Sequence, residues 1–154
     1  MSFRISGLPA SQFAAWFSLS DAELAQRHAV RCVADAVHSF PCRVSLTDAE
    51  VGQEVLLINY EHQPAASPFR ATHAIFIRAG EQTFDAVDEV PDALRRRLLS
   101  LRAFDAAGMM RHADVVDGRE LEGAVETMLA DSKTAYLHAH FAKPGCYAAR
   151  IERA

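Results

Sequence analysis

Lysine is nearly absent from this chain of 154 residues, with only Lys133 and Lys143, so arginine supplies almost all of the positive charge. The 16 basic residues face 20 acidic ones, and a net charge of -4 disfavours a general affinity for nucleic acid. Glycine and proline are also few, at 7 and 6, and no repeat or low-complexity stretch is present. These absences exclude collagen-like, repeat and disordered classes. Since 50% of the residues are hydrophobic, we expect a soluble globular protein with one domain over residues 1–154.

Long apolar runs and cysteines are scarce as well. No run approaches the roughly 20 apolar residues that a membrane-spanning helix needs, so we expect no membrane association. Residues 1–19 are interrupted by polar residues and a proline, and they lack the apolar stretch of a signal peptide. Three cysteines are an odd number, which favours free thiols over a disulfide framework. Together these features predict a cytoplasmic protein.

Four helices are predicted from their start signals. Ser20 and Glu23 have the spacing of a capping box, which is the clearest local signal in the chain. The other three helices are expected to begin at Pro9, Pro91 and Asp117. The helix from Pro91 is expected to carry Leu94, Leu98 and Leu101 on one face.

Seven stretches have the alternation or the composition of β-strands. They are Phe3–Ser6, Glu54–Tyr60, His73–Arg78, Leu101–Phe104, Met109–Val116, Thr134–Phe141 and Cys146–Ile151. Gly108 can adopt the left-handed backbone conformation that a hairpin loop needs, so the two strands beside it are expected to form a hairpin. With hairpins and few strand-helix-strand alternations, the predicted fold class is α+β. It should contain a mostly antiparallel sheet with about four helices packed on it.

Two histidines in the predicted strand 134–141 are candidate catalytic residues. His138 and His140 lie two residues apart, so they share a face with Tyr136 and are separated by about 6.6 Å. Such a pair can act as a general base, bind an anion or ligate a metal, although a metal would need a third ligand. The alternative is that both belong to the polar, solvent-facing side of an edge strand. We assign no metal ligand.

Cys42 is the candidate nucleophile. It follows Pro41 at a stiff turn and precedes Arg43, a cation that would favour the thiolate. If residues 42–46 form a strand, the two side chains point to opposite faces and this local effect is lost. The alternative for Cys42 is a buried, inert thiol. Cys146 begins the last strand, where an even hairpin loop would turn it away from the histidines and an odd loop or a bulge would reverse that.

The candidate substrate-binding residues are three arginines, Arg43, Arg70 and Arg102. A planar guanidinium suits bidentate contacts with carboxylate or phosphate groups. Arg70 lies in a loop stiffened by proline, which could direct it into a pocket, and the alternative is a surface ion pair. Residues 95–97 are also arginines, but on a helix they point about 100° apart and would make no single basic patch.

Several segments resemble a bacterial family of proteins of this length that is catalogued as domain of unknown function 1203. The resemblance covers nearly the whole chain and rests on residues 40–46 (FPCRVSL), 62–78 (HQPAASPFRATHAIFIR), 101–108 (LRAFDAAG) and 137–154 (LHAHFAKPGCYAARIERA). The residues that match its pattern are Cys42, Arg43, Arg70, His138, His140, Gly145 and Cys146. His73 departs from it, because residues 72–74 stand where the family more often has Ser-Gly-Pro. The resemblance implies no established reaction, cofactor or partner.

Three functions stay open, and the first is favoured. The protein would be a binding or regulatory module that uses a groove for an unknown ligand, or a face for homodimer formation. Alternatively, it would be an enzyme for a small anionic metabolite, with Cys42 as nucleophile, a histidine as general base and an arginine holding the anion. The third is a metal-binding protein using His138, His140 and one cysteine. The sequence indicates no particular cofactor.

Overall fold

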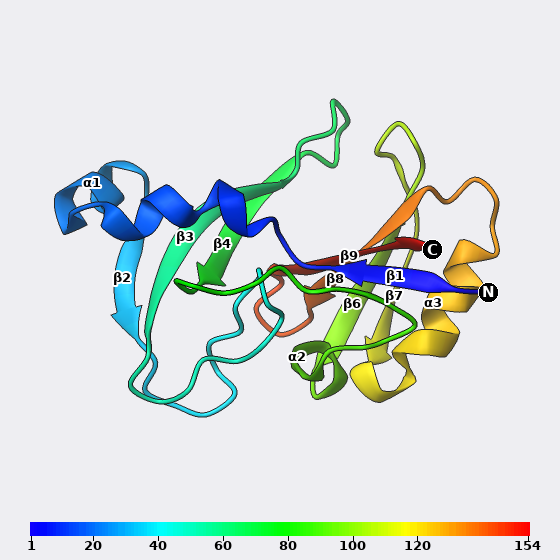
Figure 1. Cartoon of the computed structure of the whole chain (residues 1–154). Coiled ribbons are helices and arrows are strands. Elements are labelled where there is room, and N and C mark those ends of the chain that lie inside the picture. Colours follow the sequence, from blue (N-terminus) through cyan, green and yellow to red (C-terminus); the bar gives the residue numbers. More distant parts are fainter.

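Two antiparallel sheets form the framework of the computed structural model, which describes residues 1–154 (Figure 1). The larger sheet has the strand order β5-β1-β9-β8-β6-β7, and the smaller has the order β2-β3-β4. The strands are β1 (Phe3–Ser6), β2 (Val30–Val33), β3 (Glu54–Gln63), β4 (Ala71–Ile77), β5 (Asp85–Val87), β6 (Leu98–Phe104), β7 (Met110–Asp117), β8 (Tyr136–Phe141) and β9 (Tyr147–Arg153). The predicted α+β class with mostly antiparallel pairing is confirmed.

Short helices occupy the four predicted regions. The α-helices are α1 (Asp21–Gln26), α2 (Asp92–Arg95) and α3 (Leu121–Leu129), and the 3-10 helices are Ala10–Gln12, Ala14–Ser18 and Gly118–Glu120. The capping box is present, because the Ser20 hydroxyl accepts from the Glu23 N–H at 3.2 Å and the Glu23 carboxylate accepts from the Ser20 N–H at 2.7 Å. None of the helices has the length and apolar character that crossing a membrane would require.

The helix predicted from Pro91 is shorter than expected. It ends at Arg95 and keeps only Leu94 of the three leucines assigned to its apolar face, whereas Leu98 and Leu101 lie in β6. In that strand Leu98 is exposed whereas Leu99 and Leu101 are buried, which is the period of two that a strand produces. The prediction of one leucine face on a helix is therefore wrong. The reason is long-range: β6 is paired on both sides, with β7 and β8.

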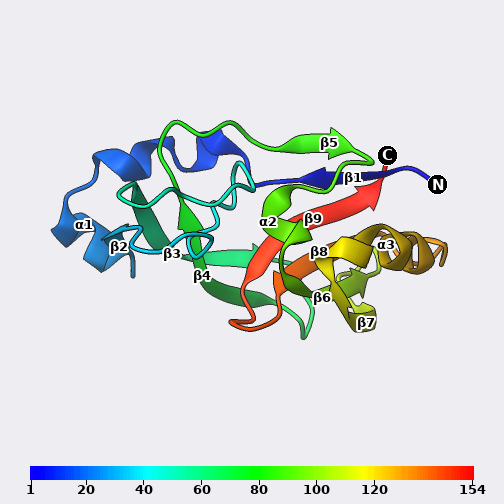
Figure 2. The same cartoon turned by 90° about the horizontal axis from the view of Figure 1, so that it is seen from below.

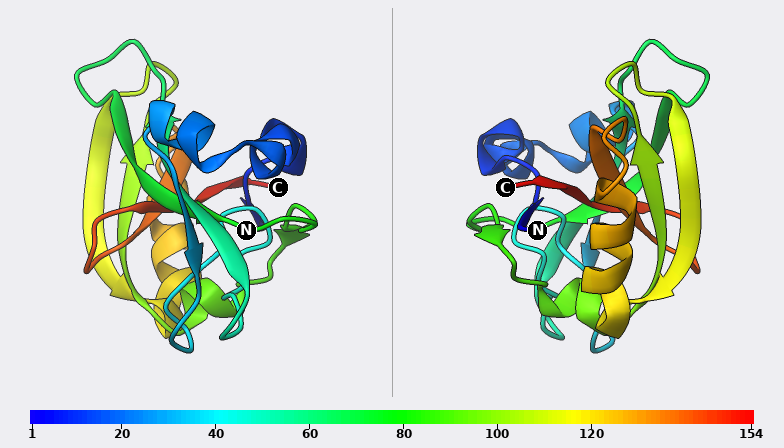
Figure 3. Two further views of the ribbon diagram at one scale, coloured as in Figure 1. Left: turned by 90° about the vertical axis from the view of Figure 1, so that its left-hand side faces the viewer. Right: turned by 90° about the vertical axis from the view of Figure 1, so that its right-hand side faces the viewer.

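The larger sheet has one apolar and one polar face. Helix α3 lies along the apolar face (Figure 3), where Leu121 and Val125 pack with residues of β6 and β8 such as Leu101 and Ala139. The polar face carries Arg102 on β6 directly across from His138 on β8. Because side chains alternate along a strand, the same pairing that buries the leucines brings these polar residues together.

The smaller sheet has its own core and lies beside the larger sheet (Figures 1 and 2). Its inner face packs against α1 and the first 3-10 helices, through residues that include Ile58, Ile75, Leu24 and Phe13. Tyr147 at the start of β9 belongs to this second core, so the last strand of the larger sheet links the two. A site between the sheets can therefore collect side chains from both.

The two predicted hairpins of the larger sheet are present. Gly108 has a φ of +77° in the turn between β6 and β7, as a left-handed turn position requires. In the terminal hairpin His140 lies opposite Tyr147, and Cys146 packs with the apolar core on the α3 side. The side chain of Cys146 thus lies away from the histidines, as an even loop predicts. The pairing of β8 with β9 does shift register between Ala139 and His140, but this shift lies beyond Tyr147 and does not turn Cys146 toward the histidines.

Candidate anion-binding site

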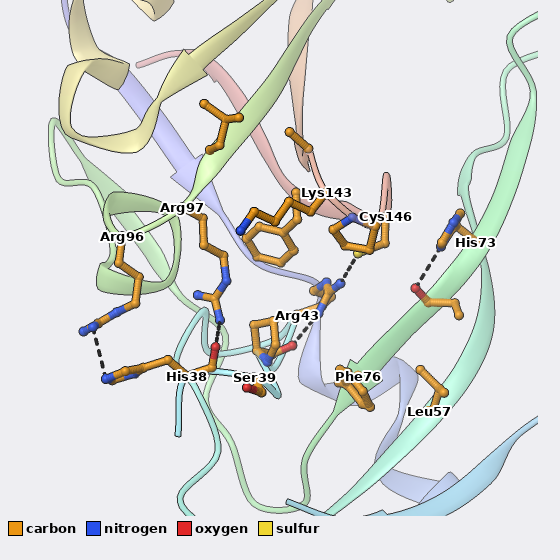
Figure 4. Close-up of a pocket in the computed structure, with 16 residues that line it drawn as sticks. His38, Ser39, Arg43, Leu57, His73, Phe76, Arg96, Arg97, Lys143 and Cys146 are labelled. Atoms are coloured by element: carbon orange, nitrogen blue, oxygen red, sulfur yellow. Dashed lines mark hydrogen bonds between the residues drawn. The ribbon is translucent and has the colours of Figure 1, made fainter. Parts of the chain in front are cut away.

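A cavity of about 600 Å³ lies where the turn between β8 and β9 faces the smaller sheet (Figure 4). Five segments form its walls: the loop 38–43, strand β3, strand β4, residues 96–98 after α2, and the turn 141–146. The lining residues are His38, Ser39, Pro41, Arg43, Leu57, His73, Ala74, Phe76, Arg96, Arg97, Leu98, Phe141, Ala142, Lys143, Pro144 and Cys146. These segments are far apart in the sequence, so only the packing of the two sheets assembles the cavity.

The lining is positively charged. It includes four cations, namely Arg43, Arg96, Arg97 and Lys143, together with two histidines, and it includes no carboxylate. Lys143 is one of only two lysines in the chain. Because like charges repel, their convergence costs free energy that a bound or neighbouring anion can offset.

Asp48 compensates part of this charge from behind the lining. Its carboxylate accepts from Arg97 at 2.5 and 3.2 Å, and it lies 3.9 Å from the guanidinium of Arg96. The Asp48 side chain is only 10% exposed, so solvent screens this interaction weakly. Arg43 and Lys143 form no ion pair in the structure. Their charges are the ones left for a ligand.

Arg43 is the buried cation of the cavity, with 2% of its surface exposed. Its Nε donates to the carbonyl oxygen of Tyr147 at 2.7 Å, and one terminal nitrogen donates to that of Pro41 at 2.5 Å. The other terminal nitrogen donates to the Sγ of Cys146 at 2.9 Å (Figure 4). A guanidinium has five N–H donors, so two of them have no acceptor within the protein.

The position of Arg43 is fixed by an aromatic ring as well. The guanidinium carbons of Arg43 and Arg97 lie 4.8 and 4.9 Å from the centre of the Phe141 ring, which are cation–π distances. Burial lowers the pKa of Arg43 to about 10, and the Cys146 thiol acts in the opposite direction. The guanidinium therefore keeps its proton at neutral pH, and it is a fixed positive charge in the wall of the cavity.

Cys42 lies outside this cavity. Its side chain is 1% exposed and packs in the core of the smaller sheet. The neighbouring Arg43 extends instead to Cys146, which is 103 residues away in the sequence. Residues 43–45 form a turn rather than a strand, and the two side chains still diverge. The structure thus gives Cys42 the surroundings of a core residue.

His138 and His140 lie in a separate cluster, on the polar face of the larger sheet. Strand β8 is interior, between β9 and β6, so the interpretation as the solvent-facing side of an edge strand is wrong. His62 from β3 covers them, with its ring centre 5.0 Å from that of His140 and 6.3 Å from that of His138. Tyr147 stacks on His62. The cluster is part of the contact between the two sheets.

The clustered histidines are neutral at physiological pH. Burial lowers the pKa of His138 and of His140 to about 3, and that of His62 to about 4. The Nδ1 of His140 lies 3.0 Å from the carbonyl oxygen of Gly145, so this nitrogen carries the ring proton. The buried Nδ1 atoms of His62 and His138 have no partner. Imidazoles of such low basicity suit a general base poorly.

No group of three or more His, Cys, Asp or Glu side chains is arranged to hold a metal ion. The three imidazoles of the histidine cluster, with ring centres 5.0 to 6.3 Å apart, are not arranged as such a group. The arrangement of these side chains therefore gives the metal-binding alternative no support.

Arg70 and Arg102 do not line the cavity. Arg70 donates to the carboxylate of Glu61 at 3.2 Å in an exposed ion pair on the loop side of the smaller sheet. Arg102 on β6 donates to the Ser100 hydroxyl at 3.2 Å beside the histidine cluster, and burial lowers its pKa. Of the three candidate arginines, only Arg43 is part of the cavity.

Four residues of the cavity, Arg96, Arg97, Lys143 and Cys146, are not among the site residues that the sequence predicts. The two arginines were expected to diverge on a helix, but α2 ends at Arg95, and both of them reach the cavity from the following turn. The prediction that this run makes no common patch is therefore wrong for residues 96 and 97. The isolation of Lys143, in a chain with almost no lysine, was the signal that could have identified the turn.

The fold and the cavity together describe an α+β protein with a cationic site between two antiparallel sheets. Residues 39–153 match the family described as protein of unknown function (DUF1203), and the chain belongs to this family. The matched region contains every lining residue except His38. Searches of curated proteins and of solved structures gave no match to the chain. Because the family description names no activity, the function has to be argued from the site.

Proposed function

We propose that this protein is a binding module for a small anionic ligand, which occupies the cavity between the two sheets. The observation that carries the proposal is a lining with four cations and no carboxylate. Arg43 contributes a buried charge without an ion pair and two N–H donors without an acceptor. An anion at this position would satisfy both, and charge-assisted hydrogen bonds of this kind are among the strong ones.

The hydrophobic residues of the lining indicate what the uncharged part of the ligand is like. Seven of the 16 lining residues are hydrophobic, and they include Leu57, Phe76 and Phe141. The volume of about 600 Å³ falls within the range of roughly 300 to 1,000 Å³ that is usual for small-molecule sites. We therefore infer a ligand with a carboxylate or phosphate group at Arg43 and Lys143 and an apolar body.

Calorimetric titration with benzoate and phenyl phosphate tests this proposal, with benzamide as the neutral analogue. We expect at least one of the anions to bind, and benzamide to bind at least about tenfold more weakly than benzoate, because only the anions interact with the uncompensated cations. Binding of the anions should also weaken at high salt. Failure of both anions to bind, or equal binding of benzamide and benzoate, would contradict the proposal.

The two lysines provide a matched pair of variants. Lys143→Gln removes one cation from the lining and should weaken the binding of the preferred anion by about three- to tenfold. Lys133→Gln makes the same chemical change at an exposed position after α3, and it should leave the affinity unaltered. An equal effect of the two changes would show that net charge, rather than this cavity, governs binding.

The proposal includes a cytoplasmic location. All three cysteines are free, and two of them, Cys42 and Cys146, are buried. Free thiols in a chain that contains no disulfide suit a reducing compartment. Fractionation of the producing cells, with detection of the protein by antibody, checks this location.

A further inference from the structure

We propose that Cys146 is a reactive thiol of the cationic cavity, and that the cavity directs small anionic electrophiles to it in preference to neutral ones. This inference rests on the anion-binding role proposed above and adds a chemical reaction to it. The geometry that carries it is the contact of 2.9 Å between a terminal nitrogen of Arg43 and the Sγ of Cys146.

The acceptors around Arg43 indicate that the Cys146 sulfur is the atom most suited to carry a negative charge beside it. Of its three acceptors, two are the neutral carbonyl oxygens of Pro41 and Tyr147, and the third is the Sγ of Cys146. The sulfur is therefore the one contacted atom that can become negative by losing a proton. A buried cation with no carboxylate partner stabilises an anion beside it, because removing both charges from water is costly unless they are paired.

The position of Cys146 also gives it access to a ligand. The residue lines the cavity with Lys143, at the end of the turn between β8 and β9. Neither of the other thiols shares this setting: Cys42 is enclosed in the core of the smaller sheet, and Cys32 lies on β2 outside the cavity. A neighbouring cation favours a nucleophilic thiolate, and Cys146, although only 6% exposed, is the one thiol that combines such a cation with a place in the cavity wall.

Iodoacetate is a suitable probe because it combines a carboxylate with an electrophilic carbon. The Cys146 thiol first releases its proton to solvent. The thiolate then attacks the methylene carbon, so that the S–C bond forms and the C–I bond breaks, with iodide leaving with the bonding electron pair. The carboxylate of the reagent lies near Arg43 and Lys143 during this displacement. Iodoacetamide undergoes the same displacement without a charge, so the two reagents differ in the feature that the cavity is proposed to select.

The test compares the alkylation rates of individual cysteines in the folded protein by mass spectrometry. The ratio of the iodoacetate rate to the iodoacetamide rate at Cys146 should exceed the ratio at Cys32 by at least about tenfold. It should decrease at high salt and in Lys143→Gln, but not in Lys133→Gln. Arg43→Gln should lower it further, and Arg43→Lys should retain part of the effect as a control for folding.

Two results would overturn the inference. One is a Cys146 that reacts only after unfolding, and the other is a Cys146 whose rate ratio equals that of Cys32. If benzoate or phenyl phosphate still binds and depends on Lys143, the anion-binding function stands and only the reactive thiol is lost. If neither anion binds and the rate ratios are also equal, both proposals fail.

Discussion

Acidification from about pH 7.5 to about pH 5 should lower the free energy of unfolding by at least about 4 kcal/mol, because His138 and His140 are buried in their neutral forms and His62, whose pKa is lowered to about 4, adds to the loss. The side chains of His138 and His140 are almost inaccessible, at 3% and 1% exposure. Their pKa values are lowered to about 3 in the folded state, against about 6.5 for an unperturbed histidine. Between these values the unfolded state binds protons and the folded state does not.

The magnitude follows from that difference. Stability contributed by a group with a lowered pKa in the folded state is fully present above about pH 6.5, and it is lost as the pH falls toward about 3. A solution at about pH 5 is about 1.5 pH units below the pKa that each histidine has in the unfolded state. At about 1.36 kcal/mol per unit, this amounts to about 2 kcal/mol for each residue. Most carboxylates titrate below this interval, so the interval from about pH 6.5 to 5 isolates the histidines.

Urea unfolding followed by the fluorescence of Trp16 and by circular dichroism measures this effect at several pH values. The double variant with His138→Gln and His140→Gln should lose most of the slope, whatever its stability at neutral pH. His112→Gln, at an exposed position of β7, serves as the control and should keep the slope. A wild-type protein of equal stability at both pH values, or a double variant with the full slope, would refute the reasoning.

Two further predictions concern packing and charge. Gly118→Ala should cost at least about 2 kcal/mol in urea unfolding, because its Cβ would lie 1.9 Å from a carbonyl oxygen of α2. Gly123→Ala, with no atom within 4 Å of its Cβ in α3, should instead stabilise by about 0.5 to 1 kcal/mol. Asp48→Asn releases Arg97 from its ion pair and should tighten binding of the preferred anion by about threefold in the same calorimetric titration. Weaker binding would mean that Asp48 holds Arg97 in place for the ligand.

The sequence predicted well those features of the fold that depend on residues close together in the chain. The capping box of Ser20 and Glu23 marks the start of α1, and Gly108 marks a left-handed turn between two strands. In both cases residues within a few positions supply the hydrogen bonds or the backbone freedom that decide the structure. The alternation that places His138 and His140 on one face is equally local, because it follows from the period of a strand.

The predictions failed where a distant partner decided the outcome. The leucines after Pro91 fit a helix by spacing, but Leu98 begins a strand because β7 and β8 pair with it on both sides. Likewise, the spacing of His138 and His140 could not show that β8 is interior or that His62 covers them. Pairing between strands satisfies backbone hydrogen bonds, and it overrides a weak local preference.

The sequence by itself determined the α+β class, the family and the local turns and caps of this protein. It also identified Arg43 as a candidate, but it associated this residue with the neighbouring Cys42. Only the tertiary structure joined Arg43 to Cys146 and placed Lys143 and Arg97 in the same cavity. The physical reason is that local periodicity in a sequence predicts to which face of a strand or helix a side chain points. Its partner across a cavity depends on the order of the strands and the packing of the two sheets.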